Sequence, residues 1–155
     1  MNTSQRTSQN EAAAAYADLV LIVLRLGALL SEAAEQIAAT GGLTAARSQV
    51  LAGVLDEPRP VAEIARRMGL TRQSVQRLAD TLVRDGYAHW EPNPRHRRAK
   101  LLAPTPRGQR ALRRVASRQD AWTSGIGHAI GPHELRRATR ALRRVLHAMQ
   151  EHPPA

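Results

Sequence analysis

Residues 61–108 decide the fold and read VAEIARRMGLTRQSVQRLADTLVRDGYAHWEPNPRHRRAKLLAPTPRG. The first ten have the apolar spacing of a short helix that ends at Gly69, because glycine commonly follows the last residue of a helix. A second helix is predicted from 71 to about 85. Two short strands, at about 87–91 and 98–103, then flank a loop rich in arginine. The stretch therefore predicts helix, turn, helix and hairpin, in that order.

This order of elements is typical of a winged helix-turn-helix, whose second helix enters the major groove of DNA. Outside it, the apolar periodicity predicts helices at about 11–39, 44–55, 106–124 and 132–150. We therefore expect a mainly α fold with a small β-hairpin wing and with N- and C-terminal dimerisation helices. The expected organisation is a disordered N-terminus (1–10), a helical dimerisation region (11–40 and 106–150) and a DNA-binding domain (41–105).

The net charge of +10 is concentrated in one part of the chain. Residues 59–118 hold fifteen basic residues against four acids, whereas the flanking segments are close to neutral. A basic block of this kind favours a polyanionic partner. A GC-rich genome would explain why 22 of the 23 basic residues are arginine, but it does not explain why they cluster.

Composition excludes several other classes of protein. The chain has no cysteine, which rules out disulfides, thiolate zinc sites and thiol redox switches. The most apolar stretch, residues 19–30, is shorter than a bilayer span and contains Arg25. We therefore expect a cytoplasmic protein that does not contact membranes, with this helix buried against partners.

The predicted second helix has one apolar side and one polar side. At about 100° per residue, the apolar residues from Val75 to Leu82 face the core. Arginine suits guanine edges and glutamine suits adenine edges, so the polar side predicts major-groove contacts. The residues assigned to the major groove are Gln73, Gln76, Arg77, Arg72 and Ser74, and Thr71 and Arg84 are assigned to phosphates.

The loop of the predicted hairpin is stiffened by Pro92 and Pro94 and carries charge of one sign. An ordinary hairpin turn favours Asn-Gly and mixed charges, so this loop favours a DNA contact over a solvated turn. Narrow minor grooves attract inserted arginine. Arg95 and His96 are therefore assigned to the minor groove, and Arg97 and Arg98 to phosphates.

Taken together, these segments resemble the MarR family (multiple antibiotic resistance regulators) of winged-helix transcription factors, over about residues 11–150. The resemblance is strongest at Ile64–Leu70, at Thr71–Tyr87, and from Asn93–Arg98 to Thr105-Pro106-Arg107-Gly108. The chain departs from the family where Asn93 and His96 replace two acids of the wing and Pro104 replaces a leucine. Asn93 can still accept a hydrogen bond from Arg95, but without charge assistance.

The resemblance implies a homodimer built from the first, fifth and sixth helices. The apolar stripes of these helices, which a small winged-helix core could not cover, point the same way. Two-fold symmetry predicts a pseudo-palindromic operator with half-sites about 10 base pairs apart. The resemblance also implies a repressor released by a small aromatic or anionic effector, with Tyr16, Arg47, His89 and Trp122 as pocket candidates.

Other functions have less support in the sequence. The six histidines show no i, i+4 pair, so we expect no metal site. No phosphate loop or nucleophile motif is present, so we expect neither an enzyme nor a cofactor. A nucleoid-type protein that coats DNA through charge alone is the main alternative. An RNA-binding winged helix would need exposed aromatics, and a DNA-free interaction module would not concentrate arginine on the wing.

Overall fold

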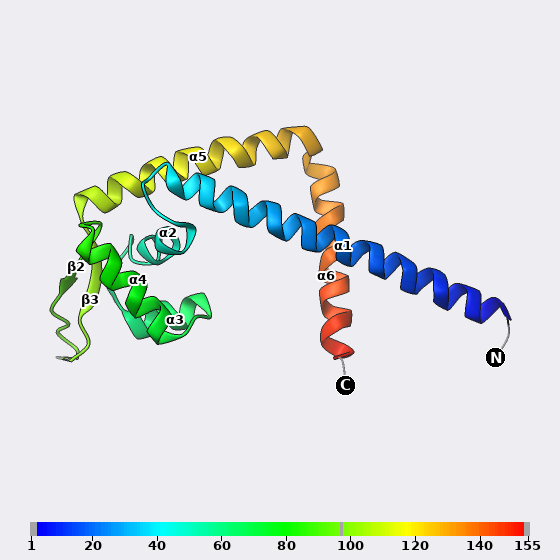
Figure 1. The fold of residues 1–155 in the computed structure, drawn as a ribbon, viewed down its shortest axis with the longest axis horizontal. Helices are drawn as coiled ribbons and strands as arrows, with labels where there is room; N and C mark the ends of the chain where they lie inside the picture. Colours follow the sequence, from blue (N-terminus) through cyan, green and yellow to red (C-terminus); the bar gives the residue numbers. More distant parts are fainter. Residues whose placement is uncertain (1–2, 97, 154–155) are drawn as a thin grey trace. The chain divides into compact units, whose positions relative to one another are not determined.

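The computed structural model describes residues 3–96 and 98–153, with side chains from Asn10 onward (Figure 1). It confirms a mainly α fold with a small antiparallel sheet. The elements are α1 (Thr3–Ala39), α2 (Ala45–Ala52), β1 (Arg59–Pro60), α3 (Val61–Met68), α4 (Arg72–Arg84), β2 (Ala88–Glu91), β3 (Leu101–Pro104), α5 (Pro106–Ile130) and α6 (Pro132–Glu151).

The chain forms two compact units, which meet at Val115 and Ala116 within α5. The first turns of α5 belong to the unit that contains the winged helix, because Ala111, Leu112 and Val115 are buried in it. This unit also contains α1, which was grouped from the sequence with the C-terminal helices as a dimerisation region. The second unit contains the rest of α5 and all of α6.

The core of the first unit is aliphatic, as the shortage of aromatic residues requires. Leu51 of α2, Ile64 of α3, Leu82 of α4 and Leu102 of β3 are almost completely buried. Burying a side chain of this size stabilises the fold by about 1.5–3 kcal/mol. Because α4 packs on α2, α3 and β2, its polar side is left facing outward.

Capping side chains and one glycine set three helix ends close to where the sequence predicted them. The Thr44 side chain accepts a hydrogen bond from the Arg47 amide (3.3 Å) and caps α2. Thr71 caps α4 in the same way through the Ser74 amide (3.2 Å). Gly69 follows α3 with φ 64°, a left-handed conformation that strongly favours glycine.

The sheet has three strands, in the order β1-β3-β2, where the sequence predicted two. Arg59 pairs with Leu102, and Pro60 with Leu101, so Pro60 precedes α3 instead of forming its first turn. The Arg59 side chain is buried and binds Asp56 (2.7 Å), Glu57 and Glu63. The Arg59 guanidinium holds the pKa of Asp56 well below its usual range.

Tyr87, between α4 and β2, joins segments that are far apart in the sequence. Its hydroxyl donates a hydrogen bond to the carbonyl of Gly42 (3.2 Å). The guanidinium carbon of Arg107 lies 4.5 Å from the centre of its ring, and that of Arg47 lies 5.5 Å away. Gly108 packs directly against its backbone carbonyl. The entry to the wing is thereby tied to the end of α1, to α2 and to the start of α5.

Helix α1 is longer than predicted, and from Asn10 onward most of its exposed side chains are apolar. It begins at Thr3, so residues 3–10, which were predicted to be disordered, are helical. Leu21, Ile22 and Leu24 are each about two-thirds exposed. From Asn10 to Ala39 the helix is long and apolar enough to cross a membrane by length and composition. Residues 19–30 alone are too short, but the alanine-rich turns beside them extend the apolar length.

The second unit differs from the prediction at one place. Gly125 and Gly127 do not interrupt α5, and the chain breaks only at Gly131, where φ is 83°. Pro132 then occupies the first turn of α6, where the absence of an N–H costs nothing. Leu135, Leu142, Leu146 and Met149 of α6 are exposed.

Candidate nucleic-acid interface

The polar side of α4 carries the side chains that the sequence assigned to the major groove. Val75, Ala79 and Leu82 point into the core, as predicted. Gln73, Arg77 and the phosphate candidate Arg84 are exposed, with Arg72 exposed at the first position of the helix, while Ser74 and Gln76 are partly exposed. The structure thus presents all five major-groove candidates on the surface of one helix.

Hydrogen bonds already hold some of these side chains. The Thr71 hydroxyl, which caps α4, also donates a hydrogen bond to the Ser74 hydroxyl (2.9 Å), so both hydroxyls are already engaged. The Gln76 amide donates to Asp80 one turn later (2.9 Å). Gln73 and Arg77 have no side-chain hydrogen bond among the residues described, so their donors and acceptors are available to a ligand. These two residues are the best placed for reading bases.

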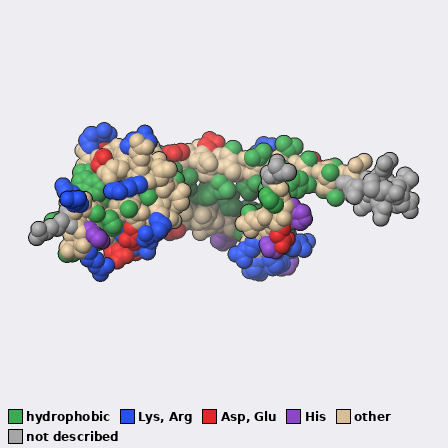
Figure 2. All heavy atoms as spheres, turned by 90° about the horizontal axis from the view of Figure 1, so that it is seen from below, with side chains coloured by type: hydrophobic (Ala, Val, Ile, Leu, Met, Phe, Trp, Pro, Cys, Tyr) green, Lys and Arg blue, Asp and Glu red, His purple; other side chains and the backbone are tan. Residues whose placement is uncertain are grey.

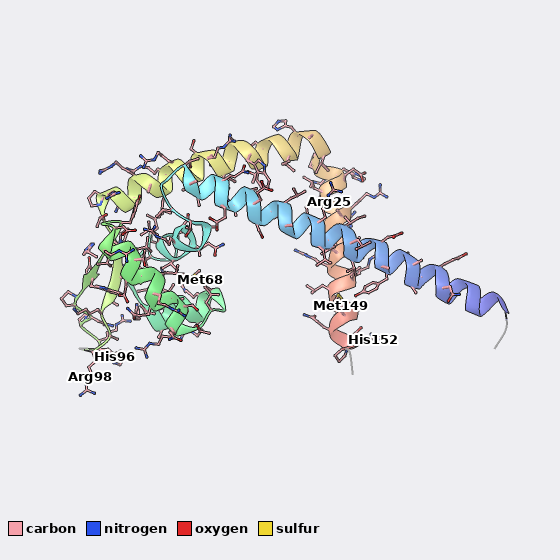
Figure 3. The ribbon with its side chains drawn as sticks, viewed as in Figure 1. Arg25, Met68, His96, Arg98, Met149 and His152 are labelled. Atoms are coloured by element: carbon pink, nitrogen blue, oxygen red, sulfur yellow. The ribbon has the colours of Figure 1, made fainter. Side chains whose placement is uncertain are left out.

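The wing loop is ordered by Asn93 through its own backbone. The Asn93 side-chain oxygen accepts a hydrogen bond from the Arg95 amide N–H (3.0 Å), which makes a short local turn. The predicted bond between Asn93 and Arg95 therefore forms with the backbone, and the Arg95 guanidinium is left exposed. Figure 3 shows His96 and Arg98 at the end of the hairpin, with Arg98 directed away from it. Arg97 lies outside the described residues.

A hollow of about 270 Å³ lies between the start of α3, α4 and the wing. Arg72 and Gln76 of α4 and Trp90, Arg98 and Lys100 of the wing help to line it. Trp90 and Lys100 were not assigned to the interface from the sequence. The signal was available for Lys100, which is the only lysine of the chain and stands in the basic run of the wing.

Most of the arginines of this surface are free of carboxylates. Within the described part of the chain, Arg72, Arg77, Arg95 and Arg98 have no acidic partner within 4 Å, whereas Arg84 binds Asp85 (3.1 Å). Unpaired guanidinium groups are suited to phosphate and to guanine, because they offer several donors in one plane.

Arg47, a candidate for the effector pocket, has a partner within the protein. Its guanidinium donates to the Asp85 carboxylate (2.7 Å), which lies just beyond the end of α4. Hydrogen bonding from Arg84 and the positive charge of Arg47 lower the pKa of Asp85. Arg47 therefore joins α2 to the end of α4, and its Nε is buried without a hydrogen bond.

The other pocket candidates lie on separate elements. Tyr16 is exposed on α1, His89 is exposed on β2 and contacts Glu91 (2.9 Å), and Trp122 is partly exposed on α5. None of the four candidates lines the hollow beside α4. Among the residues described, no three metal-ligating side chains come together.

Comparison with known proteins identifies relatives along nearly the whole chain. Residues 41–99 match the family model described as MarR family. An uncharacterised protein of Mycobacterium tuberculosis is 38% identical over 138 residues, which cover 89% of this chain and 96% of that protein.

Solved structures share the fold at lower identity. A MarR family transcription regulator superposes with a TM-score of 0.80 at 19% identity, covering 94% of this chain and 99% of the other. The M. tuberculosis regulator MOSR, solved in complex with DNA, has a TM-score of 0.61 at 22% identity, and the match covers 83% of this chain and 96% of MOSR. CouR from Rhodococcus jostii RHA1, bound to p-coumaroyl-CoA, has a TM-score of 0.67 at 22% identity, and the match covers 89% of this chain and 94% of CouR.

Proposed function

Because the chain belongs to the MarR family, we propose that it is a sequence-specific regulator of transcription that binds double-stranded DNA and acts as a homodimeric repressor. One observation carries this proposal: the polar side of α4 and the basic wing border the same hollow. In each subunit α4 would enter a major groove and the wing would reach the neighbouring minor groove.

Specific roles follow from the contacts described above. Gln73 and Arg77 would read base edges, because their side chains are exposed and hold no hydrogen bond among the residues described. Arg95 would enter the minor groove. Arg98 and Lys100, which help to line the hollow, would contact the phosphates between the two grooves.

A second copy of the chain is the proposed occupant of the apolar surface of α1. Isolated exposed leucines are common in proteins, but a long apolar helix face marks an interaction surface. The exposed residues of α1 include Leu21, Leu24 and Leu29, and the second unit, taken by itself, exposes Ile126 of α5 and Leu146 of α6. This arrangement explains the apolar length of α1 in a cytoplasmic protein. It also gives the two reading helices the symmetry of a pseudo-palindromic operator.

Release by a small aromatic or anionic effector is the remaining part of the proposal. Its support is the family and the CouR structure, which contains an aromatic acyl-CoA. Because Arg47 already binds Asp85, an anionic effector at Arg47 would compete with that ion pair and loosen the end of α4.

The proposal is tested by fluorescence anisotropy on a duplex from upstream of the gene, compared with a scrambled duplex over a range of salt concentrations. A specific regulator binds one duplex more tightly by a factor of about 10³ or more at physiological salt. Equal binding to every duplex in a genome-wide selection of bound sequences, with a steep salt dependence, would instead establish the nucleoid-type alternative.

A further inference from the structure

A row of arginines on α6 takes no part in the DNA contacts proposed above. At about 100° per residue around the helix axis, the five arginines between residues 136 and 144 fall within a sector of about 120°. Figure 2 shows a dense group of basic side chains on this helix, and all five are exposed. We call Arg136, Arg137, Arg140, Arg143 and Arg144 the α6 arginine row.

Arg140 stands at the centre of the row, with arginines at four neighbouring helical positions. Arg136 and Arg137 precede it by four and three residues, and Arg143 and Arg144 follow it by three and four. Side chains at these spacings are neighbours on a helix, and like charges there destabilise it. An anion placed over Arg140 would relieve all four repulsions together.

The protein itself supplies little of that negative charge. Among the residues described, only Arg137 of the row has a carboxylate partner, Glu134 at 3.2 Å. Arg47 and Arg59 of the first unit, by contrast, bind acids at 2.7 Å. An open, shallow depression on α6 is lined by four arginines of the row together with Glu134 and two alanines. In the part of the chain that the structure describes, the row thus keeps most of its guanidinium donors free of carboxylates.

The chemistry of the row suits a chain of phosphates. Guanidinium groups bind phosphate oxygens through paired hydrogen bonds. From Arg136 to Arg144 the helix rises about 12 Å, at about 1.5 Å per residue. One strand of duplex DNA carries a negative charge about every 3.4 Å along its axis, so the row matches about three phosphates.

The apolar residues of α6 have a partner in the homodimer proposed above, which leaves the arginine row as the side open to a ligand. A helix that lies on a bilayer buries its apolar face and keeps its cationic residues at the lipid headgroups. On α6 the apolar residues Leu135, Leu142 and Leu146 lie on the side opposite the row. Because the second copy would cover these leucines in the proposed dimer, a bilayer would have only the arginines to bind, and vesicles of anionic lipid test that alternative below.

We propose that the α6 arginine row is a second binding surface for the phosphodiester backbone of duplex DNA, so that the protein holds two duplexes at once. The row lies in the second compact unit, whereas α4 and the wing lie in the first. The identity of the ligand rests on the proposed function, but the cationic surface does not depend on it.

The absence of cysteine allows each surface to be monitored separately. A dye on His147→Cys, on the same side of α6, reports the row, and a dye on Ala99→Cys reports the wing. Both proteins are titrated with the upstream duplex at physiological ionic strength. We expect the wing dye to respond first and the α6 dye to respond to duplex added after the first response is complete.

The variant Arg140→Gln/Arg143→Gln/Arg144→Gln removes three charges of the row but keeps the helix, because glutamine also favours helix. It should abolish the α6 response, leave the wing response unchanged, and make the salt dependence of second-duplex binding shallower by about 0.9 per arginine removed. The matched triple lysine variant keeps the charge and should keep most of the response.

Three results would overturn the inference. The α6 dye could respond equally in the glutamine variant, respond together with the wing dye to the first duplex, or respond to vesicles of anionic lipid but not to DNA. A silent wing dye would instead refute the proposed function, whatever the α6 dye does.

Discussion

Replacing Gly108 with alanine should destabilise the protein even though alanine is the better helix former. An alanine Cβ at this position would lie 2.1 Å from the backbone oxygen of Tyr87 and 3.4 Å from Leu51. The oxygen cannot move freely, because it also accepts a hydrogen bond from the Thr105 amide (3.0 Å). The start of α5 must therefore shift away from the wing.

The sign of the effect follows from two opposing magnitudes. Alanine in place of glycine stabilises a helix interior by about 1 kcal/mol. Overpacking against a rigid neighbour costs about 1–3 kcal/mol, and a contact with backbone lies at the upper end of that range. We expect a net loss of about 2 kcal/mol, which lowers the melting temperature of a chain of this size by about 4–8 °C.

Gly125 of the same helix supplies the matched control. An added Cβ there meets no atom within 4 Å, so Gly125→Ala should only gain helix propensity. The two variants are compared by thermal unfolding followed by circular dichroism. All samples have the same protein concentration, because association raises the melting temperature. If Gly108→Ala raised the melting temperature as Gly125→Ala is expected to do, the close packing of α5 on Tyr87 would be refuted.

Five further substitutions test the core, the ion pair, the DNA surface and the dimer. Leu82→Ala should lower the free energy of unfolding by about 2–5 kcal/mol in urea titrations, because the side chain is fully buried. Asp85→Asn should lose stability relative to the parent at neutral pH. Since the folded pKa of Asp85 lies below 3.8, the difference should shrink as the pH falls below that value. Arg95→Ala should weaken binding to every duplex, whereas Gln73→Ala should change base preference by about 1–3 kcal/mol at one position, as measured by anisotropy on single-base variants. Leu24→Glu should convert the proposed dimer to a monomer in sedimentation velocity experiments, and an unchanged sedimentation coefficient would place the interface elsewhere.

The helix ends and the polar side of α4 could be predicted because they depend on local chemistry. Thr44, Thr71 and Gly69 act through neighbours no more than five residues away. The polar side of α4 follows from helical periodicity alone. The same reasoning ended the fifth helix at about residue 124, just before Gly125, but one glycine costs only about 1 kcal/mol and the helix continues through it to Ile130.

The features that the sequence did not reveal depend on contacts between distant segments. β1 has only two residues and includes Pro60, so it shows no strand pattern, and it exists only because β3 lies beside it. Arg47 and Asp85 are 38 residues apart, and no local pattern relates them. The sequence therefore did not reveal the ion pair between Arg47 and Asp85, and the effector pocket at Arg47 stays a prediction.

The junction at Tyr87 also bears on the order in which the chain folds. Gly42 and Tyr87 are 45 residues apart, and a contact of that separation closes a long loop, which makes it slow to form. Contacts that form after the transition state leave the folding rate almost unchanged and instead slow the escape from the native state. The hydrogen bond between the Tyr87 hydroxyl and Gly42, which joins the wing to the end of α1, would thus form late in folding. It would lower the unfolding rate more than it raises the folding rate.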